Sequence, residues 1–307
     1  MGASLLSSAE ATTFMNSITS AAVLGSLESL AMMPWRMVFP GRHELLATLL
    51  DGAQRSGASA IDIEYQESLG VLRLRDNGSL PNGPRALSAV RTGMLSTPEE
   101  FSANRPDLLR YAAMLACTKR LKIQTAAHSV TIEPEHFIRD GEVRPARISS
   151  VLSGVQFALD LLAEHRCTAH RLNEEIKALV RGFPLPVSLN GQPLPRPYAI
   201  SARVFTPFAH GAYCIDQALA EDEHHVFLAG LPIESSEGRP AYLPGGTIVH
   251  LHPEIFQFGT PGHRGLDGGA ITLAFLRHEI QLLTGYCVQL RDDDEEEAWH
   301  GSDLPTQ

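Results

Sequence analysis

Two groups of polar residues have the types and the spacing that chemistry requires. Glu44, Thr48 and Asp51 follow one another at intervals of four and three, and Asp76-Asn77-Gly78 closes an alternating segment. Residues four apart share a helix face, so the Glu44 carboxylate and the Thr48 hydroxyl would point into one space. Taken singly, these residues are ordinary, since a solvated Glu and an Asp in a turn are both common. Their value lies in their order along the chain.

Periodic segments predict the elements that hold these residues. Apolar residues recur through 43–55 as on an amphipathic helix, and Gly57 follows its end. The segments 61–65 and 71–75 alternate apolar and polar residues, which predicts a hairpin that leads into the Asp76 turn. The apolar residues of the predicted helix over 43–55 are Leu45, Leu46, Leu49, Leu50 and Ala53.

Weaker patterns extend the prediction along the rest of the chain. Asn190-Gly191 is a hairpin-turn signal after a short strand. We predict helices over 9–33, 85–91, 108–117 and 271–283, a largely helical stretch over 148–180, and strands over 121–124, 129–133, 226–232 and 246–251.

This order of elements resembles the GHKL ATPases, which include gyrase-type topoisomerases, ninety-kilodalton heat-shock chaperones, mismatch-repair ATPases and sensor histidine kinases. The resemblance covers about residues 35–285, with motifs only in the first third. It implies that Glu44 is the general base and that Thr48 stands where an Asn helps to hold magnesium. It also implies that Asp51 serves the magnesium shell and that Asp76, with Asn77 and Gly78, binds adenine.

The sequence departs from the family pattern where phosphates should bind. Leu80 replaces the second glycine of the adenine loop, and a side chain there changes the loop or fills the pocket. The segment 103–111 contains no glycine, and Pro106 lacks an amide donor. Arg105 and Arg110 could attract a phosphate, whereas Asp107 would repel it. We therefore expect binding of ATP or ADP with magnesium to be weak or lost, which favours a pseudo-ATPase.

The resemblance implies an α+β fold with a GHKL-like (Bergerat) mixed sheet covered on one face by helices, and a smaller α/β transducer-like domain behind it. We divide the chain into an N-terminal helical segment (1–34), the ATPase-like domain (35–185), the transducer-like domain (186–290) and an acidic tail (291–307). The tail contains six consecutive acidic residues, Asp292 to Glu297. Such a run is typical of a solvated terminus.

Composition limits the classes of partner. A net charge of -10 argues against a general nucleic-acid or anionic-membrane surface. The 4 cysteines are far apart and have no metal-ligand spacing, which predicts reduced thiols in a cytoplasmic protein. The sequence shows neither a secretory signal nor a membrane span. The expected partners are other proteins or a second copy of the chain.

Three alternatives remain open. The chain could be an active ATPase with Glu44 as general base, or a scaffolding protein that never binds nucleotide. A metal site in the second domain could be formed by histidines 224, 225, 250, 252 and 263, although no known ligand spacing matches.

The N-terminal helical segment either caps the sheet or exchanges with a partner copy, as GHKL dimers do.

Overall fold

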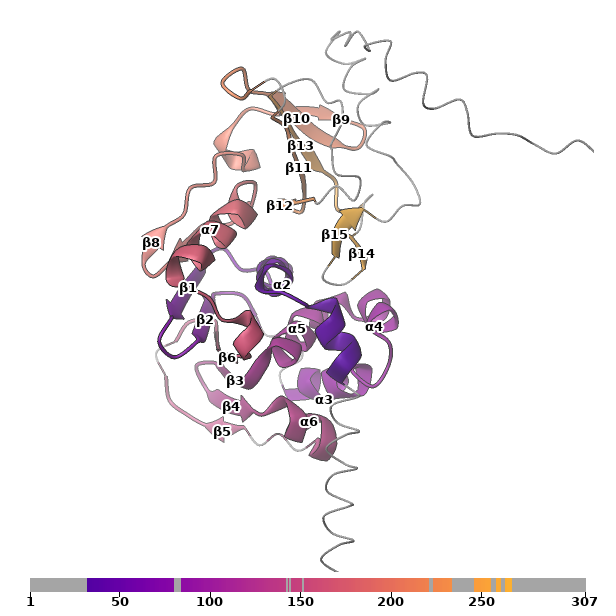
Figure 1. Ribbon diagram of the computed structural model, residues 1–307, viewed down its shortest axis with the longest axis vertical. Coiled ribbons are helices and arrows are strands. Elements are labelled where there is room, and N and C mark those ends of the chain that lie inside the picture. Colours follow the sequence, from indigo (N-terminus) through magenta and orange to yellow (C-terminus); the bar gives the residue numbers. More distant parts are fainter. Residues whose placement is uncertain are drawn as a thin grey trace, which may run out of the picture.

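A computed structural model describes most of the chain between residues 32 and 266 (Figure 1). None of the helices in this part combines the length and the apolar surface needed to cross a bilayer. The described residues are 32–79, 84–141, 143, 145–150, 152–220, 223–233, 246–254, 258–260 and 263–266. The predicted helix over 271–283, the acidic tail and nearly all of the N-terminal segment lie outside them.

The larger part of the protein is an 8-stranded mixed sheet in the order β5-β4-β3-β6-β2-β1-β7-β8. β1 pairs with β7 in parallel, and the other neighbours are antiparallel. The strands are β1 (Ile61–Gln66), β2 (Val71–Asp76), β3 (Thr118–Gln124), β4 (His128–Ile132), β5 (Ala146–Arg147), β6 (Val155–Leu161), β7 (Val187–Leu189) and β8 (Gln192–Pro193).

Helices cover one face of this sheet. Side chains on β1 alternate strictly between buried and exposed, so one face of the strand meets the core and the other meets solvent. α2 and α5 contact each other and lie together on the buried side (Figure 1). Residues 32–38 are also helical. The named helices are α2 (Arg42–Arg55), α3 (Pro84–Gly93), α4 (Pro98–Asn104), η1 (Pro106–Leu108), α5 (Leu109–Cys117), α6 (Pro134–Asp140), η2 (Ala163–His165) and α7 (Ala169–Val180).

A second, 5-stranded mixed sheet follows in the order β12-β11-β13-β10-β9. β11 is parallel to β13, and the other pairs are antiparallel. Beside it lies a two-stranded hairpin. The elements are η3 (Ile200–Ala202), β9 (Thr206–Phe208), β10 (Gly211–Ile215), β11 (His225–Leu228), β12 (Leu231–Pro232), β13 (Thr247–Leu251), β14 (Phe258–Thr260) and β15 (His263–Leu266).

The two sheets meet where α7 ends. The Phe227 ring of β11 lies directly on Gly182, where an added Cβ would come within 2.5 Å of a ring carbon. Tyr198 donates its backbone N–H to the Arg181 carbonyl at 2.9 Å and accepts a 2.7 Å hydrogen bond from the Arg181 side chain at its hydroxyl. Glycine at 182 is therefore needed for the close approach of β11 to the first unit.

The predicted α+β class with a mixed sheet is confirmed, as are the helix over 43–55 and the hairpin after it. Asn190 and Gly191 have φ of 49° and 78° and form the predicted turn, which joins β7 to β8. The predicted helical stretch over 148–180 is wrong in its first half, because residues 155–161 are strand β6. The pairing of β7 with β1 carries the first sheet beyond residue 185.

Candidate functional site

Asp76 lies at the end of β2 with its carboxylate closed off from solvent. Oδ1 accepts a hydrogen bond from the Gly78 N–H at 3.0 Å, and Oδ2 accepts one from Arg110 Nη1 at 3.0 Å. The Asp76 side chain is 0% exposed and the Arg110 side chain 2%. Both carboxylate oxygens are therefore already engaged within the protein, and the charge of Asp76 is neutralised by a buried cation.

Arg110, the second residue of α5, reaches Asp76 across the surface of α2. A Cβ on Gly52 would lie 2.5 Å from Arg110 Cδ and 2.8 Å from its Cβ, so the arginine stem occupies the space that glycine leaves. The guanidinium carbon lies 4.7 Å from the centre of the Phe157 ring, within cation–π range. Three elements, α2, α5 and β6, thus enclose this side chain.

The hydrogen bonding of Arg110 is incomplete. Its Nη2 is buried and has no hydrogen-bond partner in the described structure, and neither has the buried hydroxyl of the neighbouring Tyr111. Burial raises the pKa of Tyr111, although the nearby Arg110 opposes this rise.

Asn77 and Gly78 shape the turn after β2. The Asn77 side-chain oxygen accepts hydrogen bonds from the N–H groups of Ser59 and Ala60 at 2.8 and 3.3 Å. A Cβ on the buried Gly78 would lie 2.4 Å from the Ser56 hydroxyl. These contacts fasten the turn to the segment before β1. Leu80, which was predicted to alter the adenine loop, lies outside the described residues.

The predicted magnesium ligands on α2 are engaged locally. The Thr48 hydroxyl donates to the backbone carbonyl of Glu44 at 2.8 Å. Asp51 forms an ion pair with Arg55 one turn later, at 2.7 Å. Neither arrangement presents a ligand set to a metal ion, so the residues present do not fit the magnesium that the resemblance implied. This geometry supports no catalytic step through magnesium or ATP.

Arg105, the other predicted phosphate-binding residue, is also paired. Two of its side-chain nitrogens donate to the two carboxylate oxygens of Asp107 at 3.0 and 2.9 Å, near the surface. This hydrogen bonding lowers the pKa of Asp107. Pro106 begins η1 and contributes no N–H. The segment before α5 therefore holds a local ion pair in the place where the resemblance predicted a phosphate loop.

Glu44 is half-buried and takes no part in the Asp76–Arg110 pair. Its Oε2 is buried without a hydrogen-bond partner in the described structure, as is Nδ1 of His165 in η2. Burial lowers the pKa of His165, while the charges of Glu164 and, to a smaller extent, Glu44 act to raise it. Burial also raises the pKa of Cys117 above its usual range, with a further contribution from Glu44. Neither His165 nor Cys117 belongs to a recognisable motif, so no sequence pattern indicated either residue.

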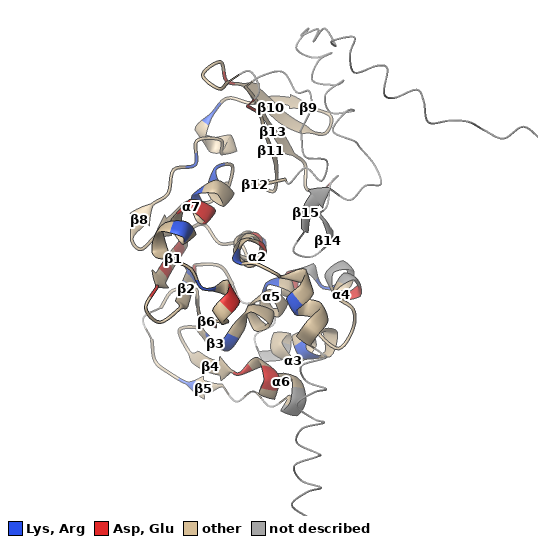
Figure 2. Ribbon diagram, in the orientation of Figure 1, with Lys and Arg blue, Asp and Glu red and all other residues tan. Residues whose placement is uncertain are grey.

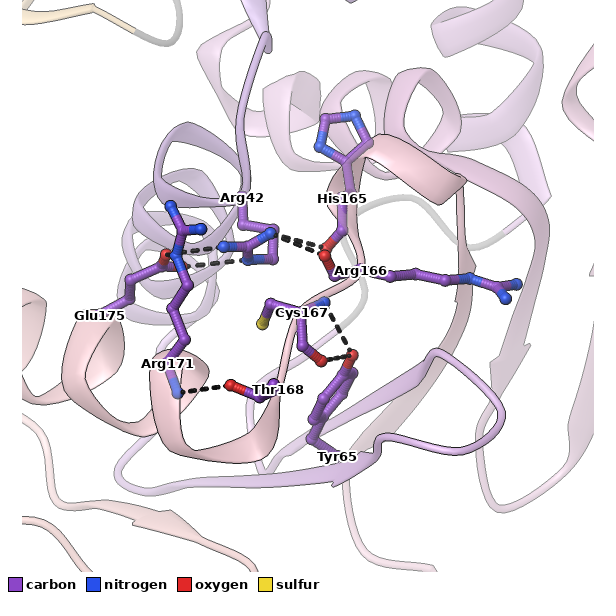
Figure 3. A network of polar contacts seen from close by, with 8 residues as sticks. All are labelled: Arg42, Tyr65, His165, Arg166, Cys167, Thr168, Arg171 and Glu175. Carbon is purple, nitrogen blue, oxygen red and sulfur yellow. Dashed lines mark hydrogen bonds and ion pairs between the residues drawn. The ribbon is translucent and has the colours of Figure 1, made fainter.

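Arg42 anchors the start of α2 to the middle of α7 and to the segment before α7 (Figure 3). Its guanidinium donates to both carboxylate oxygens of Glu175 at 3.1 and 2.7 Å, and Nη1 donates to the Arg166 carbonyl at 3.1 Å. Arg171 adds a second cation on Glu175 at 3.1 Å. Both α2 and α7 carry basic and acidic residues (Figure 2). Arg42 therefore has a structural role that fixes the orientation of α2.

The alternative of a histidine metal site finds no support among the described residues, where no three His, Cys, Asp or Glu side chains are placed together so that they could hold a metal ion. His250 is buried, stacks on Phe227 with ring centres 5.0 Å apart, and places Nε2 2.7 Å from the Tyr198 carbonyl oxygen. His225 contacts Glu223 through Nε2 at 2.9 Å. Both histidines belong to the joint between the sheets. His263 is on β15.

Comparison of the sequence with protein-family models and with curated proteins finds no match.

Proposed function

We propose that this chain is a divergent GHKL-type protein whose nucleotide site is closed by the Asp76–Arg110 ion pair. It acts through its conformation and through contacts with protein partners, without a requirement for ATP. The observation that carries this proposal is that Arg110, from the segment matched to the phosphate loop, fills the place beside the residue matched to the adenine acceptor.

The energetics of the pair support the loss of nucleotide binding. An adenine amine would have to donate to Asp76, whose carboxylate has no exposed surface and already accepts two hydrogen bonds. To make room, Arg110 would have to leave its buried partner. Separating a buried pair costs about 3–5 kcal/mol, which would weaken nucleotide binding by more than a hundredfold.

Exposed apolar side chains support a protein partner. Met33 and Met37 are 55% and 72% exposed and lie four residues apart, on one face of the helix at residues 32–38. Flexible methionines are frequent on surfaces that bind other proteins. The position of this helix at the start of the ATPase-like unit suits the N-terminal dimer contact that the resemblance implies.

The proposal is tested by isothermal titration of magnesium and a non-hydrolysable ATP analogue into the folded protein. We expect no binding heat with the wild type. Micromolar binding that Asp76→Asn abolishes would overturn the proposal and would show a working adenine pocket. ATP turnover that is lost in Glu44→Ala would instead favour the active ATPase.

A further inference from the structure

The surroundings of Arg110 have the properties of a built receptor for its head group. A fully buried carboxylate, Asp76, supplies the negative charge, and the Gly78 N–H holds that carboxylate in place. The Phe157 ring lies 4.7 Å from the guanidinium carbon, and the Tyr111 ring lies 5.7 Å from it. Charge and aromatic surfaces together favour a flat cation over a neutral molecule.

The covalent connection of Arg110 to α5 limits how well it fits this space. Its stem presses against Gly52, and its Nη2 lacks a hydrogen-bond acceptor in the described structure. A free guanidinium compound is not held by a helix backbone and can rotate to improve its contacts. The contacts with Asp76, Phe157 and Tyr111 are therefore made by the guanidinium group, and the rest of the Arg110 side chain only connects that group to α5.

We propose that Asp76, Phe157 and Tyr111 form a binding site for planar guanidinium-type cations, which Arg110 occupies from within the chain. An external cation of this class binds when the Arg110 side chain is absent or displaced. The inference goes beyond the proposed function, because it concerns the pocket around the Arg110 head group. It requires only the pocket itself and no family relationship.

Removal of the internal occupant provides the test. In Arg110→Ala, ethylguanidinium at about 20 mM should raise the melting temperature by about 3 °C or more, as expected for a ligand with millimolar affinity for the folded state. The wild type should not respond, because its own arginine fills the site. Urea is flat but neutral and ethylammonium is charged but not flat, and at the same concentration neither should stabilise the variant.

Two variants serve as controls. Arg105→Ala removes an arginine from a surface ion pair and should show no response to ethylguanidinium, and Asp76→Asn combined with Arg110→Ala should lose the response. Equal stabilisation of all the proteins, or no stabilisation of a folded Arg110→Ala, would overturn the proposal.

A measurement on the wild type covers the case in which Arg110→Ala does not fold. The guanidinium NMR signals of Arg110 should show slow rotation and slow hydrogen exchange, unlike those of Arg105. Equally fast exchange in both arginines would refute the proposal that Arg110 occupies the site. The outcome is also independent of nucleotide titration. ATP binding to the wild type would overturn the proposed function, whereas ethylguanidinium rescue reports on the pocket alone.

Discussion

The strongest prediction concerns the free energy of unfolding when one member of the Asp76–Arg110 pair is removed. Asp76→Asn keeps the side-chain shape but leaves a buried guanidinium without its counter-ion, and Arg110→Met leaves a buried carboxylate. The two side chains are 0% and 2% exposed, so solvent screens neither charge. Each single change should therefore lower the free energy of unfolding by about 3–5 kcal/mol.

The double variant, Asp76→Asn with Arg110→Met, shows whether the loss of unfolding free energy in each single variant comes from the charge left without a partner. With both charges removed, no uncompensated charge is buried, and the remaining loss is one hydrogen bond and the cation–π contact with Phe157, about 2 kcal/mol together. The sum of the two single losses should thus exceed the double loss by about 4 kcal/mol or more.

Urea denaturation is the appropriate assay, because guanidinium chloride would itself supply the proposed ligand. The Asp51–Arg55 pair offers a matched control in the same unit, with side chains 20% and 50% exposed. Its cycle should give a coupling of about 0.3–0.5 kcal/mol. Additive losses at Asp76 and Arg110, or the same small coupling in both cycles, would refute the picture of a closed, buried pair.

Three further changes test the surrounding structure. Gly52→Ala should lower the free energy of unfolding by about 1–2 kcal/mol despite the helix propensity of alanine, because its Cβ would lie 2.5 Å from Arg110 Cδ; a gain in urea melts would contradict this. Burial lowers the pKa of His250 below its ordinary value of 6.5, so its contribution to stability is present above pH 6.5 and is lost as the pH falls towards the lower pKa of the folded state. Melting temperatures from pH 7.5 down to about 5 should therefore fall less in His250→Gln than in the wild type, and identical profiles would exclude this role. Arg42→Ala should cost about 2–3 kcal/mol in urea melts, because it removes both hydrogen bonds to Glu175; a loss below about 0.5 kcal/mol would show that the clamp contributes little.

Local sequence patterns were sufficient for the elements that carry the site. The apolar stripe of α2 and the alternation of β1 and β2 are set by which side chains face the core, and that periodicity is visible in the sequence. The turn at Asn190 was predictable for a related reason, since Asn-Gly tolerates the positive φ that a tight hairpin needs.

The error over 148–180 has a physical explanation. Strand β6 reads Val-Gln-Phe-Ala-Leu-Asp-Leu, with Val155, Phe157, Leu159 and Leu161 buried and the residues between them partly exposed. Alanine and leucine in the middle are good helix formers, whereas the period of two is that of a strand. Residues 155–161 form a strand because they pair with β2 on one side and with β3 on the other. These partners are distant in the sequence, so a pattern over a few neighbouring residues does not reveal the pairing.

The destination of Arg110 could not be predicted for a different reason. The sequence identified both Asp76 and Arg110 as site residues, but it assigned them to opposite ends of a nucleotide. A long arginine side chain can reach in several directions from its helix, and the direction depends on the neighbouring surfaces. Here the absence of a side chain at Gly52 leaves the path to Asp76 open. Neither residue reveals this alone, because the path exists only after α2 and α5 have packed.

Under the proposed function, the ion pair also changes what can regulate the protein. A bound nucleotide can hold its site closed only while the ligand is present, so closure depends on concentration. Arg110 belongs to the chain and joins α5 to the end of β2 across α2 without any added ligand. Any change of state must then come from a ligand that competes for Asp76, from a partner on the exposed helix at Met33 and Met37, or from protonation at the joint around His250. The guanidinium rescue and the urea cycle both act on the Asp76 route, whereas the pH profile of His250→Gln acts on the His250 route, so these measurements separate the two.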